Sequence, residues 1–329
     1  MHDATLSGVA SRFYQSTRKI ITVRSKFFFF FVIGAVIGLA ASPAVGQEID
    51  SSSARFLILG DWGGFASENQ KAVSVAMARE AQKSKIQFVV TAGDNYHGDG
   101  IASATDTRWK TEFEDIYSDP SLQVPWYPTF GNHDYRGSAE AELEYSKYSK
   151  RWKFYARYYA QEAKIDDSTK LLIVHLDTPP FINEYRQRDE QYHVAGQDVA
   201  RQIRWLDSLL SASDDRWVIV VGHHPIYSAA PKHGNTPELI SDVLPILARH
   251  HVSAYICGHD HVMQHLFHDR MNFFVCGGGA EHREVNERDD VVFGKGSLGF
   301  LSIAAYRDSL TFRMIDEKNT LLHRSTIKK

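Results

Sequence analysis

Two cysteines are all that this chain of 329 residues contains. Cys257 and Cys276 each lie in an apolar run, YICG or FFVCGG, that is typical of a strand. So few cysteines exclude a fold built on several disulfides. Buried free thiols are the first interpretation of the pair. A disulfide between neighbouring strands is the second, because export from the cytosol would permit it.

The chain also lacks an apolar run long enough for a membrane-spanning helix, which needs about 20 residues. The run Phe27–Ala41 has 15 residues, follows four basic residues and precedes the small residues of SPAVG. This order is typical of a secretory signal peptide. We therefore predict a signal peptide over residues 1–46, a flexible segment over 47–54, a folded domain over 55–329, and a secreted, periplasmic or otherwise extracytoplasmic location. The alternative is an uncleaved membrane anchor.

Positive charge is not in excess. The formal net charge is −3, and removing residues 1–46 takes away five basic residues and one acidic residue, which changes the charge to −7. Because an excess of basic residues is the electrostatic footprint of nucleic-acid binding, we expect no nucleic-acid binding. We also expect no attraction to anionic membranes and no stable membrane insertion after signal cleavage.

From residue 55 onward, segments typical of strands and of helices alternate. The predicted strands are 55–60, 86–92, 125–130, 170–177, 216–222, 252–257, 271–276, 299–306 and 309–316. Apolar residues recur at helical spacing over 68–84, 196–212 and 238–251, and Pro245 is expected to kink or shorten the last of these helices. Continuous apolar strands favour buried parallel pairing, and the runs on either side of Arg307–Asp308 predict an antiparallel hairpin. The prediction is one α/β domain with mixed sheets covered by helices.

Five short motifs end in residues that bind metals. In chain order they are GDWGG (60–64), GDNYH (93–97), GNHD (131–134), GHHP (222–225) and GHDH (258–261). A strand that stops at glycine and then presents Asp, Asn or His places oxygen and imidazole ligands at one edge of a sheet. One such motif alone is more often a turn, but the ordered set predicts a site for two metal ions. Mixed nitrogen and oxygen ligands favour Fe, Mn or Zn over Mg or Ca.

This ordered set resembles the calcineurin-like metallophosphoesterases, and within them the small, tartrate-resistant type of purple acid phosphatase. EYSKYSKRWKF (144–154) and GHHPIYSAAPKHG (222–234) are similar to the same subgroup. The resemblance covers the chain from about residue 55 into the C-terminal hairpin. It implies a four-layer α/β sandwich in which helices flank two mixed β-sheets, so that residues 55–329 would be the catalytic domain.

The resemblance also implies a ligand set. Asp61, Asp94 and His261 would hold the first metal ion, and Asp94 would bridge to a second ion held by Asn132, His223 and His259. In the purple enzymes a tyrosine three residues after the bridging aspartate binds Fe(III) and produces the colour. His97 stands at that position here, and Tyr96 comes one residue too early. We therefore predict a centre of Fe with Fe, Zn or Mn that includes His97 and lacks the tyrosine–iron absorption band.

The implied reaction is hydrolysis of phosphomonoesters by metal-bound hydroxide. His133 and His233 match the outer histidines of the family, which donate a proton to the leaving group or hold the phosphate. His224 is predicted to contact the substrate, with a structural role as an equal alternative. We expect a small phosphorylated substrate and a monomer. A phosphodiesterase or nucleotidase using the same site is the alternative activity, and a non-catalytic binding protein is the alternative class.

The stretch 179–195 (PPFINEYRQRDEQYHVA) takes the place of a disulfide-tied regulatory loop in mammalian members of the subgroup, but it has no cysteine. It carries Tyr185, Arg186, Arg188 and His193. A lid whose arginines bind anionic groups and a solvated polar loop are the two interpretations.

Overall fold

The computed structural model describes residues 52–213 and 217–329. The predicted signal peptide and most of the segment 47–54 lie outside the described residues. Within these residues, no helix has the length and apolar character needed to cross a membrane.

Thirteen strands form two mixed sheets among the described residues. The first sheet has the order β13-β12-β11-β1-β2-β3. Its strands are β1 (Ala54–Leu59), β2 (Phe88–Thr91), β3 (Trp126–Tyr127), β11 (Phe300–Ala305), β12 (Ser309–Ile315) and β13 (Leu321–Lys328). The second sheet has the order β10-β8-β9-β7-β6-β5-β4. Its strands are β4 (Tyr159–Lys164), β5 (Lys170–His175), β6 (Trp217–Val221), β7 (Ala254–Cys257), β8 (Met263–His268), β9 (Met271–Cys276) and β10 (Val291–Lys295).

Parallel pairing is concentrated where the apolar runs are continuous. β1, β2 and β3 are parallel neighbours in the first sheet. β5, β6, β7 and β9 are parallel neighbours in the second. β11 and β12 form the predicted antiparallel hairpin, with Phe300 opposite Ile315. The carboxyl ends of the parallel strands in each sheet therefore lie at one edge.

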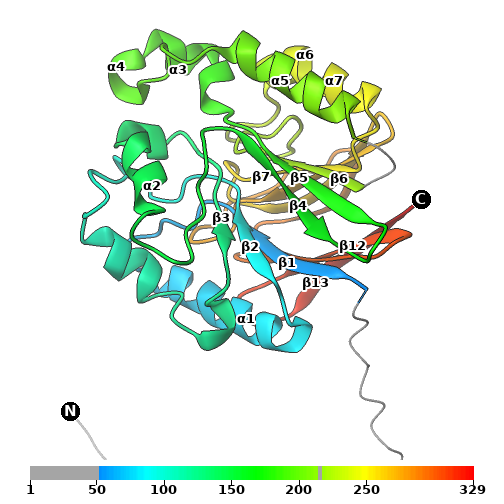
Figure 1. Ribbon diagram of the computed structural model, residues 1–329, viewed down its shortest axis with the longest axis horizontal. Coiled ribbons are helices and arrows are strands. Elements are labelled where there is room, and N and C mark those ends of the chain that lie inside the picture. Colours follow the sequence, from blue (N-terminus) through cyan, green and yellow to red (C-terminus); the bar gives the residue numbers. More distant parts are fainter. Residues whose placement is uncertain (1–51, 214–216) are drawn as a thin grey trace, which may run out of the picture. The chain divides into compact units, whose positions relative to one another are not determined.

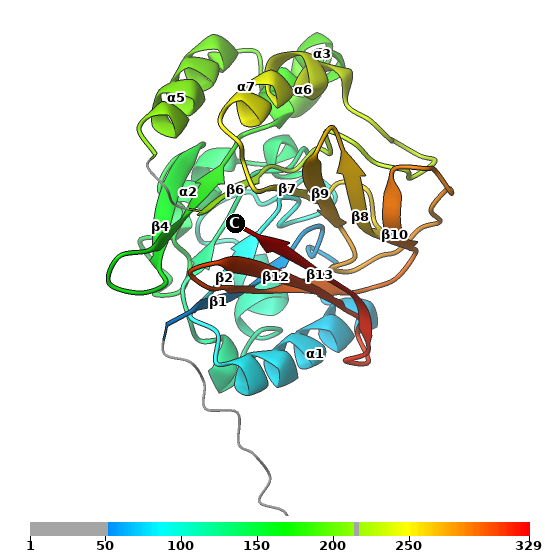
Figure 2. The same cartoon turned by 90° about the vertical axis from the view of Figure 1, so that its right-hand side faces the viewer.

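The two sheets pack face to face and helices cover their outer faces (Figure 1). Alternation along β1 shows how the layers are filled, because Phe56 and Ile58 face the core between the sheets whereas Leu57 and Leu59 face helix α1 (Glu68–Ser84). The outer face of the second sheet packs against α5 (Val199–Ser211), α6 (Pro237–Asp242) and α7 (Leu244–Arg249). Figure 2 shows these helices on one side and α1 on the other. The predicted four-layer sandwich is thereby confirmed.

The predicted helices agree with the structure. α1 spans the predicted range, and its N-cap Ser67 accepts a hydrogen bond from the Gln70 amide, which satisfies one of the free N–H groups at a helix start. Pro245 falls in the first turn of α7, where the helix restarts after α6 ends at Asp242. The predicted interruption is confirmed, because proline is accepted in a first turn but not in a helix interior. The remaining α-helices of the described residues are α2 (Ala139–Tyr145), α3 (Asn183–Gln187) and α4 (Asp189–Tyr192), and short 3₁₀ or π-helical turns lie at Trp109–Glu114, Pro120–Leu122, Asp134–Arg136 and Pro179–Phe181.

Both cysteines are buried and free. They lie at the ends of the neighbouring strands β7 and β9, and the Cys276 thiol is 3.3 Å from the Cys257 carbonyl oxygen. Burial raises the pKa of both thiols. The first interpretation, buried free thiols, is confirmed, and the alternative disulfide is not formed.

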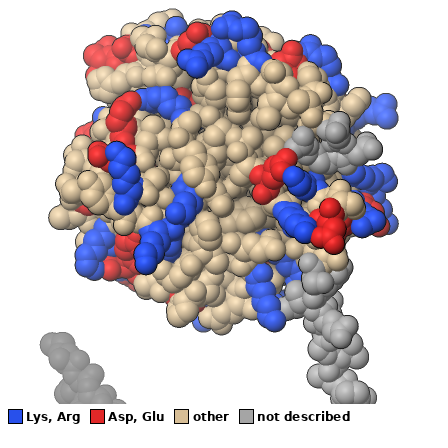
Figure 3. Space-filling view, viewed as in Figure 1, with Lys and Arg blue, Asp and Glu red and all other residues tan. Residues whose placement is uncertain are grey.

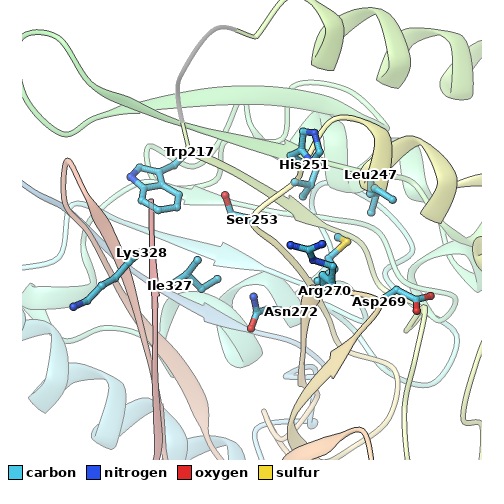
Figure 4. Close-up of a pocket in the computed structure, with 12 residues that line it drawn as sticks. Trp217, Leu247, His251, Ser253, Asp269, Arg270, Asn272, Ile327 and Lys328 are labelled. Carbon is cyan, nitrogen blue, oxygen red and sulfur yellow. The ribbon is translucent and has the colours of Figure 1, made fainter.

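Figure 3 shows charged side chains of both signs around a broad area that has no lysine, arginine, aspartate or glutamate. A pocket of about 570 Å³ lies at the edge of the second sheet where β6 and β7 begin, lined by residues that include Trp217, His251 and Arg270 (Figure 4). It contains none of the motif residues. The ligand-bearing motifs belong to the other edge, where the same strands end.

Candidate metal centre

The motif residues lie at the carboxyl ends of strands from both sheets, as expected. Asp61 follows β1, Asp94 follows β2, Asn132 follows the loop after β3, His223 follows β6, and His259 and His261 follow β7. The sheets meet at the glycines that precede these residues. A Cβ on Gly60 would lie 3.0 Å from the Gly258 Cα, and a Cβ on Gly258 would lie 2.3 Å from the Asp61 Oδ2. Only glycine allows the two strand ends to approach so closely.

Three of these residues have left-handed backbone conformations. The φ angles are 57° at Asp61, 49° at Asp94 and 65° at His259. Such conformations are costly for residues other than glycine and concentrate at functional sites. Here they turn each side chain back toward the junction between the sheets.

The first group of donor atoms comes from Asp61, His97 and His261, whose candidate ligand atoms lie within 4.8 Å of one another. The His261 Nε2 is 3.3 Å from the Asp61 Oδ1. The His97 Nε2 is buried and has no hydrogen-bond partner, and the buried Asp61 Oδ1 has no well-aligned hydrogen bond although His261 lies beside it. Because buried polar atoms nearly always have a partner, these two atoms fit coordination to a cation.

The second group surrounds the His223 Nε2. This nitrogen lies 3.2 Å from the Asn132 Oδ1, 3.2 Å from the His259 Nδ1 and 3.4 Å from the Asp94 Oδ2. The same Asp94 oxygen is 3.7 Å from the His97 Nε2 of the first group. Asp94 therefore lies between the two groups, where a bridging carboxylate has to be.

Three of the histidines have a hydrogen-bond partner at Nδ1, the ring nitrogen that points away from the centre. The Nδ1 of His97 is 3.0 Å from the Gly63 carbonyl oxygen, the Nδ1 of His223 is 2.9 Å from the Ala92 carbonyl oxygen, and the Nδ1 of His261 is 3.1 Å from the Glu281 Oε2. An Nδ1–H group donating to such an acceptor leaves Nε2 with its lone pair free. This arrangement is typical of metal-bound imidazoles, so the donor set fits two metal ions.

The electrostatics of the centre favour a cation. Burial would lower the pKa of His223, but the charge of Asp94 and a hydrogen bond with it outweigh burial and raise the pKa to about 9. Burial would likewise raise the pKa of Asp94, but His223 and the other nearby histidines hold it well below its usual range. The buried carboxylates therefore attract positive charge at this point.

Tyr96 lies away from the centre. Its ring is fully buried, 5.6 Å from the Trp62 ring and 4.9 Å from the Trp109 ring, in an aromatic cluster beneath the motifs. Burial raises the pKa of its hydroxyl well above the usual value. Tyr96 therefore points away from the donor groups, and Trp62 packs beneath the motifs.

A buried polar network supports the ligand loops, and the sequence analysis did not identify it. Asn95 Nδ2 donates to the Thr129 carbonyl oxygen at 3.0 Å and to Glu142 Oε2 at 3.0 Å. Asp134 accepts hydrogen bonds from the Gly131 amide at 2.8 Å and the Tyr96 amide at 3.0 Å. Burial and the Asp94 charge raise the pKa of Asp134 to about 7, and burial with the Asp134 charge raises that of Glu142 well above its usual value. The sequence signal was available for Asn95 and Asp134, which lie inside GDNYH and GNHD.

The two outer histidines lie beside the donor groups. His133 shares one cluster with Asp94 and His97, and its Nδ1 is 2.7 Å from the Gly98 carbonyl oxygen. His233 is exposed, and its ring centroid lies 4.2 Å from that of His259. Partial desolvation lowers the pKa of both rings, to about 4 in His233, where Lys232 and Arg283 add to the effect.

His224 is buried in the cluster with His223 and His259. Its Nδ1 is 2.9 Å from the Thr178 Oγ1 and its Nε2 is 3.1 Å from the Tyr185 hydroxyl. Both ring nitrogens therefore have protein partners, and this arrangement favours the structural alternative. Substrate contact by His224 stays a prediction.

The stretch 179–195 forms α3 and α4, and it approaches the site through two tyrosines. Tyr185 and Tyr192 stack with ring centroids 4.1 Å apart, and the Tyr192 hydroxyl accepts a hydrogen bond from Arg136 at 3.0 Å. Arg186 donates instead to the Pro180 carbonyl oxygen, and Arg188 pairs with Glu184. The arginine-bearing lid considered from the sequence therefore differs from the arrangement found, in which these arginines form local contacts.

The fold and the clustered donors define a class of metal-dependent phosphoesterase. A model of the calcineurin-like phosphoesterase family matches residues 54–263. The chain belongs to this family. Its resemblance to purple acid phosphatases, stated from the motifs, is also confirmed by curated relatives that are 32–36% identical.

Two such relatives match most of the chain. Purple acid phosphatase 7 of Arabidopsis thaliana is 32% identical over 91% of this chain and 94% of its own length. Tartrate-resistant acid phosphatase type 5 of Sus scrofa is 35% identical over 76% of this chain and 78% of its own length.

The fold is similar to solved structures at lower identity. GAP50, described as the anchor in the inner membrane complex of Plasmodium, has a TM-score of 0.75, is 22% identical, and is matched over 84% of this chain and 89% of its own. Purple acid phosphatase PPD1 from yellow lupin seeds has a TM-score of 0.60, is 17% identical, and is matched over 85% of this chain and 54% of its own. Because the fold occurs in a protein described as an anchor as well as in a phosphatase, function has to be argued from the site.

Proposed function

We propose that this protein hydrolyses phosphomonoesters at a dinuclear metal centre, as an acid phosphatase-like enzyme. The single observation that carries the proposal is the position of Asp94 between two groups of imidazole, carboxylate and amide donors. The names of its relatives support the activity, and the buried atoms without partners support the metal ions.

Two groups of residues would hold the metal ions. Asp61, His97 and His261 would hold the first, Asn132, His223 and His259 would hold the second, and Asp94 would bridge them. When bound, two such ions lower the pKa of a coordinated water and neutralise phosphate charge. Iron with iron, zinc or manganese suits the nitrogen and oxygen donors.

His133 and His233 would serve the substrate. Hydrolysis leaves an alkoxide that needs a proton, and phosphoryl transfer depends mainly on position and charge stabilisation. The hydrogen bond from His133 Nδ1 to the Gly98 carbonyl oxygen orients the ring, so that Nε2 is the atom available to the leaving oxygen. His233, exposed beside His259, is placed to hold a phosphate oxygen or to donate the proton in its turn.

The decisive experiment measures metal content and ester preference in the same preparation. We expect about two metal ions per chain and faster hydrolysis of 4-nitrophenyl phosphate than of bis(4-nitrophenyl) phosphate across the pH range. Asp94→Asn should lose both metal and activity, because it removes the bridging charge. His251→Gln, at an exposed position on the far edge, is the matched control.

Two outcomes would favour the alternatives. A strong preference for the diester would favour the phosphodiesterase or nucleotidase. Full metal occupancy without hydrolysis of any ester would favour a binding protein that has kept the fold.

A further inference from the structure

Arg136 lies beside the proposed proton donor and has no role in the proposed chemistry. It ends the short 3₁₀ helix Asp134–Arg136, which directly follows His133 and packs against α4. One guanidinium nitrogen lies 3.2 Å from the His133 Nδ1, and another donates to the Tyr192 hydroxyl at 3.0 Å. The guanidinium carbon lies 5.1 Å from the Tyr192 ring centroid.

No acidic side chain among the described residues pairs with Arg136. Its Nε is buried and has no hydrogen-bond partner. Three other partly or fully buried arginines are paired with acids: Arg108 with Glu112, Arg151 with Glu114 and Arg157 with Glu140. Arg136 is partly buried, and withdrawing a cation from water without an anion beside it is costly, so a bound anion would stabilise its charge.

The contact with His133 does not satisfy the guanidinium. The His133 Nδ1 is only 2.7 Å from the Gly98 carbonyl oxygen, so this nitrogen carries the proton and donates it there. An arginine N–H group cannot donate to a nitrogen that is itself a donor. The guanidinium therefore keeps unused donors close to the site.

The charge of Arg136 affects the pKa values of two residues in other segments. Arg136 is among the charges that lower the pKa of Lys232, after burial and Arg283. Its charge also opposes the burial that raises the pKa of Tyr185. Arg136 is thus close enough to Lys232, which precedes His233, and to Tyr185, which contacts His224, to affect their pKa values.

We propose that Arg136 is a specificity-determining residue that binds a second anionic group carried by the leaving group of the substrate. This inference rests on the proposed phosphomonoesterase function. Arg136 contacts the Nδ1 side of His133, whereas the leaving oxygen would meet Nε2, so the second anionic group has to extend past the imidazole ring to reach the guanidinium. The preferred substrates are then phosphate monoesters that bear a further carboxylate or phosphate a few atoms from the ester oxygen.

A matched pair of substrates tests the proposal. Glycerol 3-phosphate carries a hydroxymethyl group where 3-phosphoglycerate carries a carboxylate. We define the preference as the specificity constant (kcat/KM) for the carboxylate substrate divided by that for glycerol 3-phosphate, which cancels any common effect on catalysis. In Arg136→Gln we expect the preference to fall about tenfold or more, the range for a lost hydrogen bond between charged groups.

Two further variants sharpen the test. Arg136→Lys keeps the charge but loses the forked geometry, so its preference should fall between those of the wild type and Arg136→Gln, and it also serves if the glutamine variant does not fold. Arg188→Gln is the control, because Arg188 belongs to the same α3–α4 region but pairs with Glu184. It should keep the preference of the wild type.

The outcomes separate this inference from the proposed function. A preference within twofold of wild type in Arg136→Gln overturns the role of Arg136, and so does an equal loss on both substrates, which would mean that Arg136 acts through His133. Wild-type protein that carries its metal ions and hydrolyses neither substrate overturns the proposed function itself.

Discussion

His97, His223 and His261 each use one ring nitrogen to hold the ring and leave the other toward the centre. The acceptors behind them are the carbonyl oxygens of Gly63 and Ala92 and the carboxylate of Glu281. These acceptors favour the tautomer in which Nδ1 carries the proton. His97 has the same arrangement as the other two, which supports its proposed place in the coordination sphere.

The replacement of tyrosine by His97 leads to a spectroscopic prediction. With iron bound, the wild-type protein should lack a tyrosine-to-iron charge-transfer band, because Tyr96 is buried in the aromatic cluster. His97→Tyr should introduce this band, measured by visible absorption after iron loading. A wild-type band that disappears in Tyr96→Phe would contradict the structure's placement of Tyr96.

The proton-donor role of His133 predicts a separation of binding from turnover. His133→Ala should lower kcat by about 10²–10⁴-fold, the range for a general acid or base, while metal content stays near that of the wild type. The second result is expected because the ligand atoms of both groups remain. Elemental analysis measures the metal content and steady-state kinetics measure kcat, with His251→Gln as control. Turnover of His133→Ala within a few-fold of wild type would count against the role.

The sequence motifs identify the candidate ligands but not the residues that support the ligands. The structure brings the seven candidate ligands close together, because the motifs that carry them follow strands whose carboxyl ends meet. Glu142 and Tyr192 carry no local signal of this kind. Glu142 lies in α2 and Tyr192 in α4, outside the motifs. Only the packing of these helices brings the two residues to the site.

At the scale of elements, the junction between the sheets holds the centre together. The Gly258 amide donates to the His223 carbonyl oxygen at 3.0 Å, and the Gly60 amide donates to the Cys276 carbonyl oxygen at 3.0 Å. The loop after β7 is thereby tied to the loop after β6, and β1 is tied to β9 in the other sheet. The ligand positions depend on these backbone contacts.

A methyl group at the junction should therefore disturb both stability and metal binding. In Gly258→Ala the added Cβ would lie 2.3 Å from the Asp61 Oδ2 and 3.0 Å from the Ala92 carbonyl oxygen. We expect the free energy of unfolding to fall by about 1–3 kcal/mol, as in overpacked interiors, together with loss of metal. Gly196→Ala is the control, since a Cβ there has no neighbour within 4 Å. Denaturant unfolding and metal analysis test this, and unchanged metal content in Gly258→Ala would refute it.

Strands that the sequence analysis missed are mostly edge strands. β4, β10 and β13 lie at sheet edges and carry polar residues, as in LLHRSTIK of β13. Edge strands face solvent on more sides than central strands and so lack the continuous apolar run that identifies a buried strand. β8 was also missed. It is largely buried and contains Gln264 and His265, which interrupt its apolar pattern.

At the scale of the whole molecule, the buried His175 links the two sheets and affects acid stability. It ends β5 of the second sheet, and its Nδ1 is 3.0 Å from the Thr129 hydroxyl in the loop after β3 of the first sheet. Burial lowers its pKa to about 3, although a backbone hydrogen bond with Pro128 acts in the opposite direction. The neutral imidazole is therefore strongly favoured in the folded state.

The sign of the pH effect follows from this lowered pKa. Between the unfolded value of about 6.5 and the folded value of about 3, the unfolded chain binds more protons at this residue. The stability contribution is therefore complete above pH 6.5 and is lost as the pH falls. At pH 4.5 the loss from one such histidine is about 2–3 kcal/mol.

His175→Phe should remove this part of the acid sensitivity. We expect a smaller decrease in the free energy of unfolding between pH 7 and pH 4.5 than in the wild type, even if the variant is less stable at pH 7. Denaturant unfolding at matched metal content provides the measurement. The exposed His251→Gln should keep the wild-type pH dependence, and an equal decrease in His175→Phe would show that His175 does not titrate on unfolding.

The sequence by itself determined the α/β class of the fold, most of the buried strands and the residues proposed to bind metal. These depend on local patterns: apolar runs, the glycine that ends a strand, and the side chain that follows. Only the tertiary structure decided which donors face one another, which nitrogen of each histidine is free, that His224 has both nitrogens bound, and that Arg136 has no acidic partner among the described residues. These properties depend on distances between segments far apart in the chain. Packing of the two sheets sets those distances, and no local pattern encodes them.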